Sequence, residues 1–456
     1  MARGKKLRKV MMPKGAMAVA AKWEDTRGSY LTSILPIDET RQEEVEVFSV
    51  REPFSYGRVI YDRQKAEYMY EVWEPQLDDK EKRLLDSVKD ALNRTLEYDW
   101  EKMSAKDKEQ YLGEAVESFL KSRGIKLEPT TREKLEYYII RDFVGYGPID
   151  SLMSDPRIED VSCDGVGIPL FIFHQKYESV KTSVVFADED VLNNFVVALG
   201  QRCGKQISVA APILDGTSFE GHRVQATYAR EVTTRGSSFT IRRFKEKPFT
   251  PIDLIKYNTA SPEMVAYVWI AIEHGESMMV CGGTASGKTA TLNAAALFIR
   301  PGAKIVSIED TREINLPHEN WIPGTTRSGI GERGADGKAP GEIDMFELVR
   351  AALRQRPNFI IVGEVRGKET YTMFQAMATG HPTMSSMHAD SVKSMVNRLE
   401  NPPINTPRIL LTALKFVIIQ KHARVGDSTV RRITQVVELV GFEPETNELI
   451  TNTVYE

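Results

Sequence analysis

Hydrophobic positions in the first third of the chain follow the spacing of helices. Apolar residues recur three and four positions apart over 84–92, after an acidic start, which predicts an amphipathic helix. Further helices are predicted over 104–121 and 131–143. Residues 1–56 show no sustained periodicity, so we expect a flexible segment there, basic at first and then acidic. A helical N-terminal domain is therefore predicted over residues 57–144.

The pattern changes after this helical part. Short β-rich segments alternate with a helix over 190–202, which predicts a small α+β domain over residues 145–245. Prolines punctuate 246–260, as is typical of an interdomain linker. Strand-length apolar runs then alternate with helical runs, and a β-hairpin pattern over 430–455 ends the chain. Residues 261–456 are therefore expected to form an α/β domain with a parallel sheet.

Composition narrows the classes of protein. The chain has 456 residues, 41% of them hydrophobic, and 60 basic against 64 acidic side chains give a net charge of −4. We therefore expect most of the chain to fold, with no global positive field that attracts nucleic acid. Cys163, Cys203 and Cys281 are too far apart in sequence to form a zinc site, and so few cysteines are typical of a reducing cytosol. No apolar run is long enough to span a membrane.

The basic N-terminus leaves two interpretations open. Residues 1–22 carry seven Lys or Arg and no acid, but Pro13 and Lys14 interrupt the apolar part that a secretion signal would need. We therefore do not expect secretion. The segment is either a mobile tail that touches a partner or the membrane surface, or a simple solvated terminus.

The most specific signal is a phosphate-binding loop of the form GxxxxGK[ST], placed between an apolar run and a helical stretch. Its residues are Gly282, Gly283, Thr284, Ala285, Ser286, Gly287, Lys288 and Thr289. Glycines let backbone N–H groups surround phosphate oxygens, and the helix N-terminus adds a positive dipole. We expect Lys288 to reach the β- and γ-phosphates of ATP and Thr289 to bind Mg²⁺, with Thr291 also close to the nucleotide.

Two acidic strand ends follow the loop. One apolar run ends at Glu309–Glu313, and a second ends at Gly363-Glu364. Because parallel strands end at one edge of a sheet, we expect one carboxylate on the metal side and one that positions water. An ordinary Walker B strand ends in Asp, so Gly363-Glu364 departs from that pattern. Taken alone, each carboxylate would more often be a solvated or salt-bridged residue.

Three strings downstream of the loop resemble motifs of one family. RAALRQRPN at 350–358, IIVGEVRG at 360–367 and TGHPTMSSMHAD at 379–390 are similar to the type II/IV secretion ATPase superfamily, whose members are hexameric motors. The resemblance implies a RecA-like P-loop NTPase domain, preceded by a smaller α+β (PAS-like) domain and an N-terminal helical region.

The resemblance also implies roles for single residues. The family carries an acidic "Asp box", a Walker B ending in Gly-Glu and a "His box", which match 309–313, Glu364, and His381 with His388. It implies that Glu313 polarises the attacking water and that Glu364 holds Mg²⁺ through water, although these two roles could be exchanged. His388 would sense the phosphate.

Arginines of the family's N-terminal domain approach the nucleotide. Matching residue by residue gives Arg223 and Arg242 as the better candidates, and Arg230, Arg235 and Arg243 as weaker ones. A planar guanidinium can bind phosphate oxygens in pairs and stabilise the charge that develops on transfer. The alternative is that each arginine forms only a surface salt bridge.

The helical domain and the phrase RLENPPINTPRILLTAL at 398–414 resemble the archaeal branch, most closely the archaellum (archaeal flagellum) motor ATPase. The leading hypothesis is therefore a cytoplasmic homo-hexamer that uses ATP hydrolysis to power archaellum assembly or rotation. It would associate peripherally with the cytoplasmic membrane, through a polytopic membrane platform protein and other archaellum motor components.

A type IV pilus assembly or type II/IV secretion ATPase is the second hypothesis, and a non-hydrolysing nucleotide-binding regulatory scaffold is the third. The acidic balance disfavours a fourth, a nucleic-acid translocase.

Two departures from the family pattern matter. Many bacterial assembly ATPases carry a four-cysteine zinc site, which this sequence lacks, so Mg²⁺ is the metal that the resemblance implies. Archaeal relatives continue beyond a hairpin like that over 432–455, which implies that the last part of the C-terminal domain is missing here and puts stable assembly in doubt.

Overall fold

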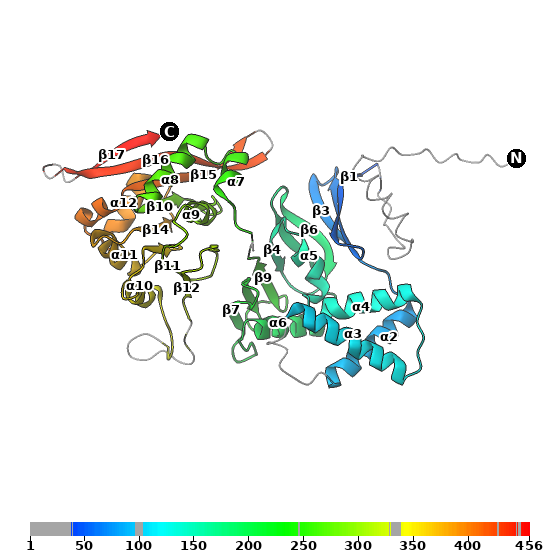
Figure 1. The fold of residues 1–456 in the computed structure, drawn as a ribbon. Helices are drawn as coiled ribbons and strands as arrows, with labels where there is room; N and C mark the ends of the chain where they lie inside the picture. The colour runs from blue at the N-terminus through cyan, green and yellow to red at the C-terminus, as the bar shows by residue number, and fades with distance from the viewer. Residues whose placement is uncertain are drawn as a thin grey trace. The chain divides into compact units, whose positions relative to one another are not determined.

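The computed structural model describes residues 38, 40–95, 104–244, 247–327, 329, 339–425, 428–443, 445 and 448–456. These residues belong to two compact units, of which the first ends at Arg243 and the second begins at Phe244. Figure 1 shows the elements of both units. The basic segment 1–22, for which we expect a mobile or solvated tail, lies outside the described residues.

The first unit contains a nine-stranded sheet. Its strands lie in the order β1-β2-β3-β6-β5-β4-β9-β8-β7, and β3 and β6 pair in parallel while the other neighbours are antiparallel. They are β1 (Gln42–Arg51), β2 (Ser55–Asp62), β3 (Glu67–Trp73), β4 (Ile158–Cys163), β5 (Pro169–His174), β6 (Glu178–Val185), β7 (Ile213–Thr217), β8 (Arg223–Thr227) and β9 (Ser238–Arg242). Helix α6 (Glu189–Arg202) packs Leu192 and Val196 on this sheet, which confirms the predicted α+β part and its helix.

Strands β1 to β3 correct the prediction for the start of the chain. Over 42–56 we expected a flexible segment and from 57 a helical domain, but the structure has three antiparallel strands over 42–73. Residues 55–60 of β2 are all buried between its neighbours, so the alternation that marks a half-buried strand is absent. Register shifts interrupt β1, which hides its pattern too.

The predicted helices follow this strand triplet. They are α2 (Asp79–Thr95), α3 (Ala105–Ser122) and α4 (Pro129–Phe143), and they share one hydrophobic core with members such as Val88, Leu112 and Leu135. The short elements η2 (Gly147–Ile149) and α5 (Asp150–Ser154) lead from α4 into β4. The three helices confirm the sequence prediction, although they share a compact unit with the sheet. No helix among the described residues is long and apolar enough to cross a membrane.

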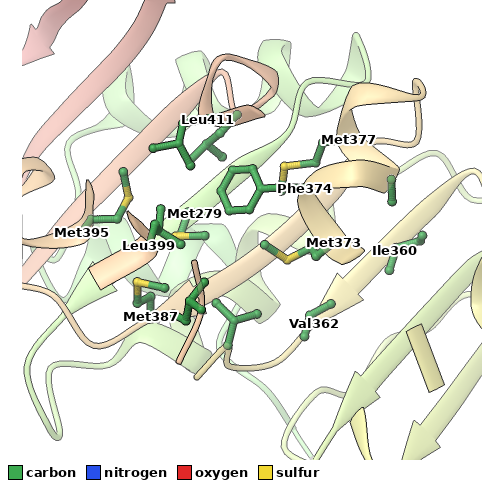
Figure 2. Packing of buried hydrophobic residues seen from close by; sticks show 14 of the residues in the cluster. Met279, Ile360, Val362, Met373, Phe374, Met377, Met387, Met395, Leu399 and Leu411 are labelled. Atoms are coloured by element: carbon green, nitrogen blue, oxygen red, sulfur yellow. The ribbon is translucent and has the colours of Figure 1, made fainter. Parts of the chain in front are cut away.

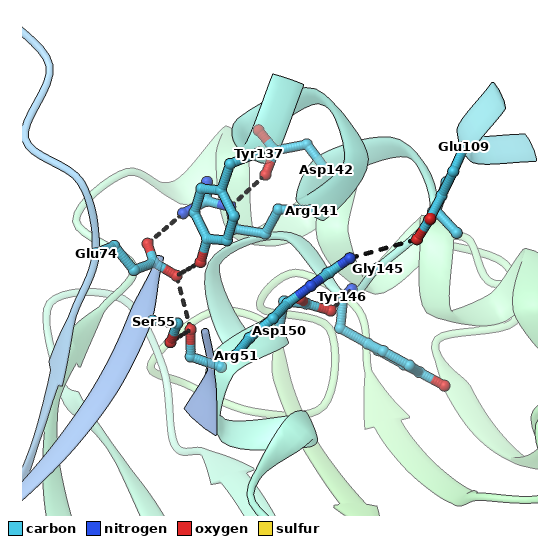
Figure 3. Close-up of polar contacts among 12 residues, drawn as sticks. Arg51, Ser55, Glu74, Glu109, Tyr137, Arg141, Asp142, Gly145, Tyr146 and Asp150 are labelled. Atoms are coloured by element: carbon cyan, nitrogen blue, oxygen red, sulfur yellow. Dashed lines mark hydrogen bonds and ion pairs between the residues drawn. The ribbon is translucent and has the colours of Figure 1, made fainter. Parts of the chain in front are cut away.

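A polar network joins these helices to the strands, as Figure 3 shows. Glu74, just after β3, accepts hydrogen bonds from Arg141 Nη1 at 2.6 Å, from Tyr137 OH at 2.9 Å and from Ser151 Oγ at 2.8 Å. Ser55 Oγ of β2 donates to Ser151 Oγ at 2.7 Å. The carboxylate of Glu74 is therefore partnered on both oxygens, and it ties β2 and β3 to α4 and α5.

An eight-stranded sheet organises the second unit. Its order is β12-β11-β13-β14-β10-β15-β16-β17, parallel from β12 to β15 and antiparallel in the last two pairs. The strands are β10 (Met278–Gly282), β11 (Ile305–Glu309), β12 (Trp321–Thr325), β13 (Phe359–Val362), β14 (Thr383–Met387), β15 (Phe416–Val425), β16 (Ser428–Glu443) and β17 (Glu448–Tyr455). This sheet confirms the predicted α/β class and the terminal hairpin. Its central strands are buried at every position, as expected of a parallel sheet covered on both faces.

Helices cover both faces of this sheet. One face packs against α8 (Pro262–Glu273) and α9 (Lys288–Ala296) through Val280, Ile305 and Ile361. The other packs against α10 (Met345–Leu353), α11 (Glu369–Ala378), α12 (Val392–Glu400) and η3 (Arg408–Ala413). Figure 2 shows how methionines gather on this second face, around Phe374 and Leu399.

A linker is predicted over 246–260, but the described residues of that stretch, 247–260, include a helix. Helix α7 (Pro251–Lys256) begins with a capping box, in which the side chains of Thr250 and Asp253 each accept from the other's backbone N–H. Leu254 of α7 packs with Ala260 and Ala294, so this helix is part of the second unit. Pro251 and Pro262 lie in the first turns of α7 and α8, so these prolines mark the starts of helices.

Candidate functional site

The phosphate loop lies between β10 and α9, at the carboxyl end of a central strand. Ala285 and Gly287 have left-handed backbones, with φ of 57° and 95°. Ser286 Oγ and Lys288 Nζ each donate to Gly283 O at 2.9 Å, so the loop is folded back on itself. This is the strand-loop-helix context that gives the motif its meaning.

Close packing accounts for two glycines of the loop. A Cβ at Gly282 would lie 2.4 Å from Gln420 O, and a Cβ at Gly287 would lie 3.0 Å from Gln420 Nε2 and 3.2 Å from Arg431 Cδ. Gln420 is buried at the centre of β15, and its Oε1 has no hydrogen-bond partner among the described residues. The loop is therefore packed directly on β15 and β16.

Three predicted site residues come together at this edge of the sheet. His388 Nδ1 lies 3.4 Å from Lys288 Nζ, and His388 Nε2 lies 3.0 Å from Glu364 Oε1. Arg366 Nη2 contacts the second oxygen of Glu364. The sheet order explains the meeting, because β10, β14 and β13 are adjacent and parallel, and Lys288, His388 and Glu364 follow their carboxyl ends. The other histidine of the predicted His box, His381, precedes β14 at the opposite edge.

The electrostatics of this trio favour a neutral imidazole. Burial lowers the pKa of the Lys288 ammonium, while the charge of Glu364 opposes the shift. Burial and then the positive charge of Lys288 lower the pKa of His388. A neutral His388 can accept from Lys288 at Nδ1, which leaves its proton on Nε2, the nitrogen 3.0 Å from Glu364 Oε1; this tautomer is assigned from the partners.

Glu309, the last residue of β11, is a site residue that sequence reasoning treated only as the first member of an acidic segment. It is 3% exposed, and its Oε1 accepts from the backbone N–H groups of Glu313 and Ile314 at 3.0 Å each. Its Oε2 has no partner among the described residues, and burial raises the pKa of the carboxyl to about 7. A Cβ at Gly363 would lie 2.9 Å from Glu309 Cγ. The available sequence signal was an acidic residue that ends an apolar strand.

The donors at this edge suit Mg²⁺ held mainly by phosphate oxygens and water. The described residues contain no group of three or more His, Cys, Asp or Glu that could hold a metal alone. Mg²⁺ prefers oxygen ligands and usually takes only one or two from protein. The hydroxyl of Thr289 and the carboxylate of Glu364 are such ligands, and the buried Oε2 of Glu309 lacks a partner in the same region.

A pocket of about 1000 Å³ opens beside these residues. Its lining includes Thr284 of the phosphate loop, Glu364 and His388, and Lys393 and Arg398 from α12. Arg398 Nη1 donates to the backbone oxygen of His388. The pocket gives polyphosphate-sized molecules and water access to Thr284, Glu364 and His388, so the arrangement can support phosphoryl transfer to water.

The candidate arginines lie in the first unit, on the exposed face of neighbouring strands. Arg223 of β8 and Arg242 of β9 are direct cross-strand partners, and Arg223 Nη2 lies 3.7 Å from Asp215 Oδ2. Like charges placed opposite each other destabilise a sheet unless an anion lies between them. The weaker candidates have other contacts: Arg230 Nη2 lies 3.0 Å from Glu189 Oε2, and Arg243 Nη1 donates to Ile158 O at 2.8 Å.

Comparison with known proteins shows the family of this chain. The family model "Type II/IV secretion system protein" matches residues 178–453. The uncharacterized protein MJ0900 of Methanocaldococcus jannaschii is 36% identical over 418 residues, 87% of this chain and 74% of that protein. The type IV secretion system protein PtlH of Bordetella pertussis is 27% identical over 282 residues, 54% of this chain and 80% of that protein. The ATPase DotB of Legionella pneumophila has a TM-score of 0.46 and 18% identity over 62% of this chain and 78% of DotB. The chain belongs to the type II/IV secretion system protein family, as its motifs predicted.

Proposed function

We propose that this chain is an ATPase that hydrolyses ATP with Mg²⁺ at the edge formed by β10, β14 and β13. The observation that carries the proposal is the meeting of Lys288, His388 and Glu364, three residues separated along the chain, beside a folded phosphate loop. Family membership supports the same activity.

The residues divide the work as follows. Backbone N–H groups of residues 282–289 and Lys288 Nζ hold the phosphates, with Thr291 following in α9. Mg²⁺, when bound through Thr289 and Glu364, neutralises phosphate charge. Glu313, positioned by Glu309, orients the attacking water, and the roles of Glu313 and Glu364 could be exchanged. His388 links Lys288 to Glu364 and responds to loss of the terminal phosphate.

Phosphate release from ATP tests the activity. We expect Lys288→Ala to abolish turnover while the fold persists, because the ammonium contacts the carbonyl of Gly283 and Lys288 is not a member of the apolar core. Lys304→Ala is the matched control, since Lys304 precedes β11 at the opposite edge of the same sheet. Undiminished turnover in folded Lys288→Ala would contradict the proposal. Loss in both variants would indicate a general effect of charge. No turnover by any assembled form would favour the non-hydrolysing scaffold.

The finer proposal is a homo-hexameric motor that works on a membrane platform protein and powers an archaellum. The resemblance of residues 398–414 to the archaeal branch and the long match to an archaeal protein support it. The match to PtlH supports the alternative, a secretion or pilus ATPase. Under the first proposal, cells of the source organism that carry the Lys288→Ala allele would lose archaellum-driven swimming. Loss of pili or of a secreted substrate with normal swimming would favour the second.

A further inference from the structure

We propose that Arg431 of β16 is a positioning residue of the nucleotide site, which holds the phosphate loop in its ATP-receptive shape through the carbonyl of Ala285. The proposal rests on the proposed function, because it concerns the same loop. It adds a residue from the C-terminal strand pair, outside all of the motifs that follow the loop.

The first observation is a direct hydrogen bond. Arg431 Nε donates to Ala285 O at 3.0 Å. Ala285 carries a side chain in a left-handed backbone, with φ of 57°, a conformation that costs free energy unless the surroundings stabilise it. A charged donor at its carbonyl supplies that stabilisation.

The second observation is packing against the end of the loop. Gly287 begins α9 with φ of 95°, and a Cβ there would meet Arg431 Cδ at 3.2 Å. The same Cβ would meet Gln420 Nε2 at 3.0 Å. The arginine stem therefore occupies the space that the glycine leaves. Arg431 contacts the loop at two positions, Ala285 through its head and Gly287 through its stem.

The third observation is the strand register that fixes the place of Arg431. Gly282 of β10 lies opposite Gln420 of β15, and His422 of β15 lies opposite Arg431 of β16. The sheet itself therefore holds the backbone of Arg431 with only β15 between it and β10, the strand that leads into the phosphate loop.

Affinity for ATP and turnover, measured separately on the full chain, test the proposal. We expect Arg431→Ala to weaken ATP binding about tenfold, the worth of one hydrogen bond from a charged group, and to change kcat by less than about twofold. Arg431→Lys should recover part of the affinity, because it keeps the charge and loses the planar donor. Should Arg431→Ala fail to fold, Arg431→Gln, which keeps most of the stem, takes its place with the same expectation.

Arg432→Ala is the matched control, because Arg432 Nη1 donates to Tyr257 O and to the backbone oxygen of Arg431, at 3.0 Å each, and neither acceptor lies in the phosphate loop. It should keep the affinity within about twofold. Equal weakening in both variants would overturn the proposal in favour of a general charge effect, and unchanged binding in Arg431→Ala would overturn it outright. If Lys288→Ala loses ATP while Arg431→Ala does not, only this inference fails. If the wild-type chain binds no ATP, the proposed function fails with it.

Discussion

In the first unit Arg58 and Glu71 are both buried and bonded to each other, whereas in the second unit Glu309 is buried with a carboxylate oxygen that has no described partner. Arg58 also lies 4.6 Å from the centre of the Trp73 ring. Burying a charge is costly, and a pair recovers much of that cost only when its geometry is good. The first unit therefore uses buried charge to hold strands together.

Buried polar atoms without a hydrogen-bond partner among the described residues occur in both units, for example His174 Nε2 in the first. In the second unit they include Glu309 Oε2 at the end of β11, Thr291 Oγ1 in α9, and Gln420 Oε1 of the residue that packs on the phosphate loop. Such atoms destabilise a fold unless a ligand or water satisfies them, so these three are candidates to contact a bound nucleotide or its water. Substitutions should thus separate the units: changes at the strand ends should cost activity, and changes in the first unit's buried pairs should cost stability.

The largest expected effect on turnover belongs to the exposed arginines of the first unit. It would be an exception to this division, because residues of the first unit would then affect activity. We expect Arg242→Ala to lower turnover on the order of 10³-fold with a smaller effect on ATP binding, because an arginine that stabilises transferring charge is worth that much. Arg230→Ala, which removes an exposed pair with Glu189, is the control. Specific activity should also rise with protein concentration in step with a hexamer seen by light scattering. Near-wild-type turnover in both Arg242→Ala and Arg223→Ala would exclude these arginines from the reaction.

The next effect concerns the two carboxylates. We expect Glu313→Gln to keep ATP affinity and to lose turnover by about 10²-fold or more, since an amide takes no proton. Glu364→Gln should instead require more Mg²⁺ for the same rate. Neither change should lower the midpoint of thermal unfolding. A Mg²⁺ titration that restores Glu313→Gln but not Glu364→Gln would reverse the two assignments.

The buried pair of the first unit should behave in the opposite way. We expect Glu71→Ala to lower the free energy of unfolding by about 3–5 kcal/mol, because it leaves Arg58 buried without its main partner. Denaturant unfolding measures the loss. The control is Glu43→Ala, which breaks the Arg63–Glu43 pair at 3.0 Å, where both side chains are more than half exposed, and should have little effect. Equal losses of unfolding free energy in the two variants would mean that burial does not determine how much each ion pair contributes to stability.

The smallest effect is a pH dependence at Glu309. Burial raises its pKa from 4.5 to about 7, so the folded form binds this proton more tightly than the unfolded form. Stability should therefore fall as the pH rises from about 4.5 to about 7, by up to about 3 kcal/mol, and level off above. Glu309→Gln does not titrate, so its stability relative to wild type should increase over that window. Urea unfolding at pH 5 and pH 8 measures the difference, and a difference independent of pH would contradict the assignment.

Local patterns predicted much of this molecule from sequence. The phosphate loop, the helices over 84–92, 104–121 and 131–143, and the parallel sheet all follow from spacing that a few adjacent residues determine. The strands over 42–73 were missed, because burial on both faces removed the alternation in β2.

The contacts of Glu309 and Arg431 could not be predicted from the sequence, for a different reason. Glu309 faces Gly363 across a strand pair, and Arg431 reaches a carbonyl 146 positions earlier in the chain. Such contacts depend on the register of strands that are distant in sequence, which no local pattern specifies.

The buried methionines of Figure 2 give the core of the second unit compliance, which is the capacity to deform slightly without losing its packing. Met279, Met373, Met377, Met387 and Met395 are buried together between the sheet and its helices, and Met387 directly precedes His388. Unbranched thioether side chains change rotamer at little cost, so a core built from them can follow a small displacement without opening a void. A core of β-branched residues would resist the same displacement. Strand β14, which His388 directly follows, thus packs on a layer of flexible side chains that can adapt to a small displacement of the strand.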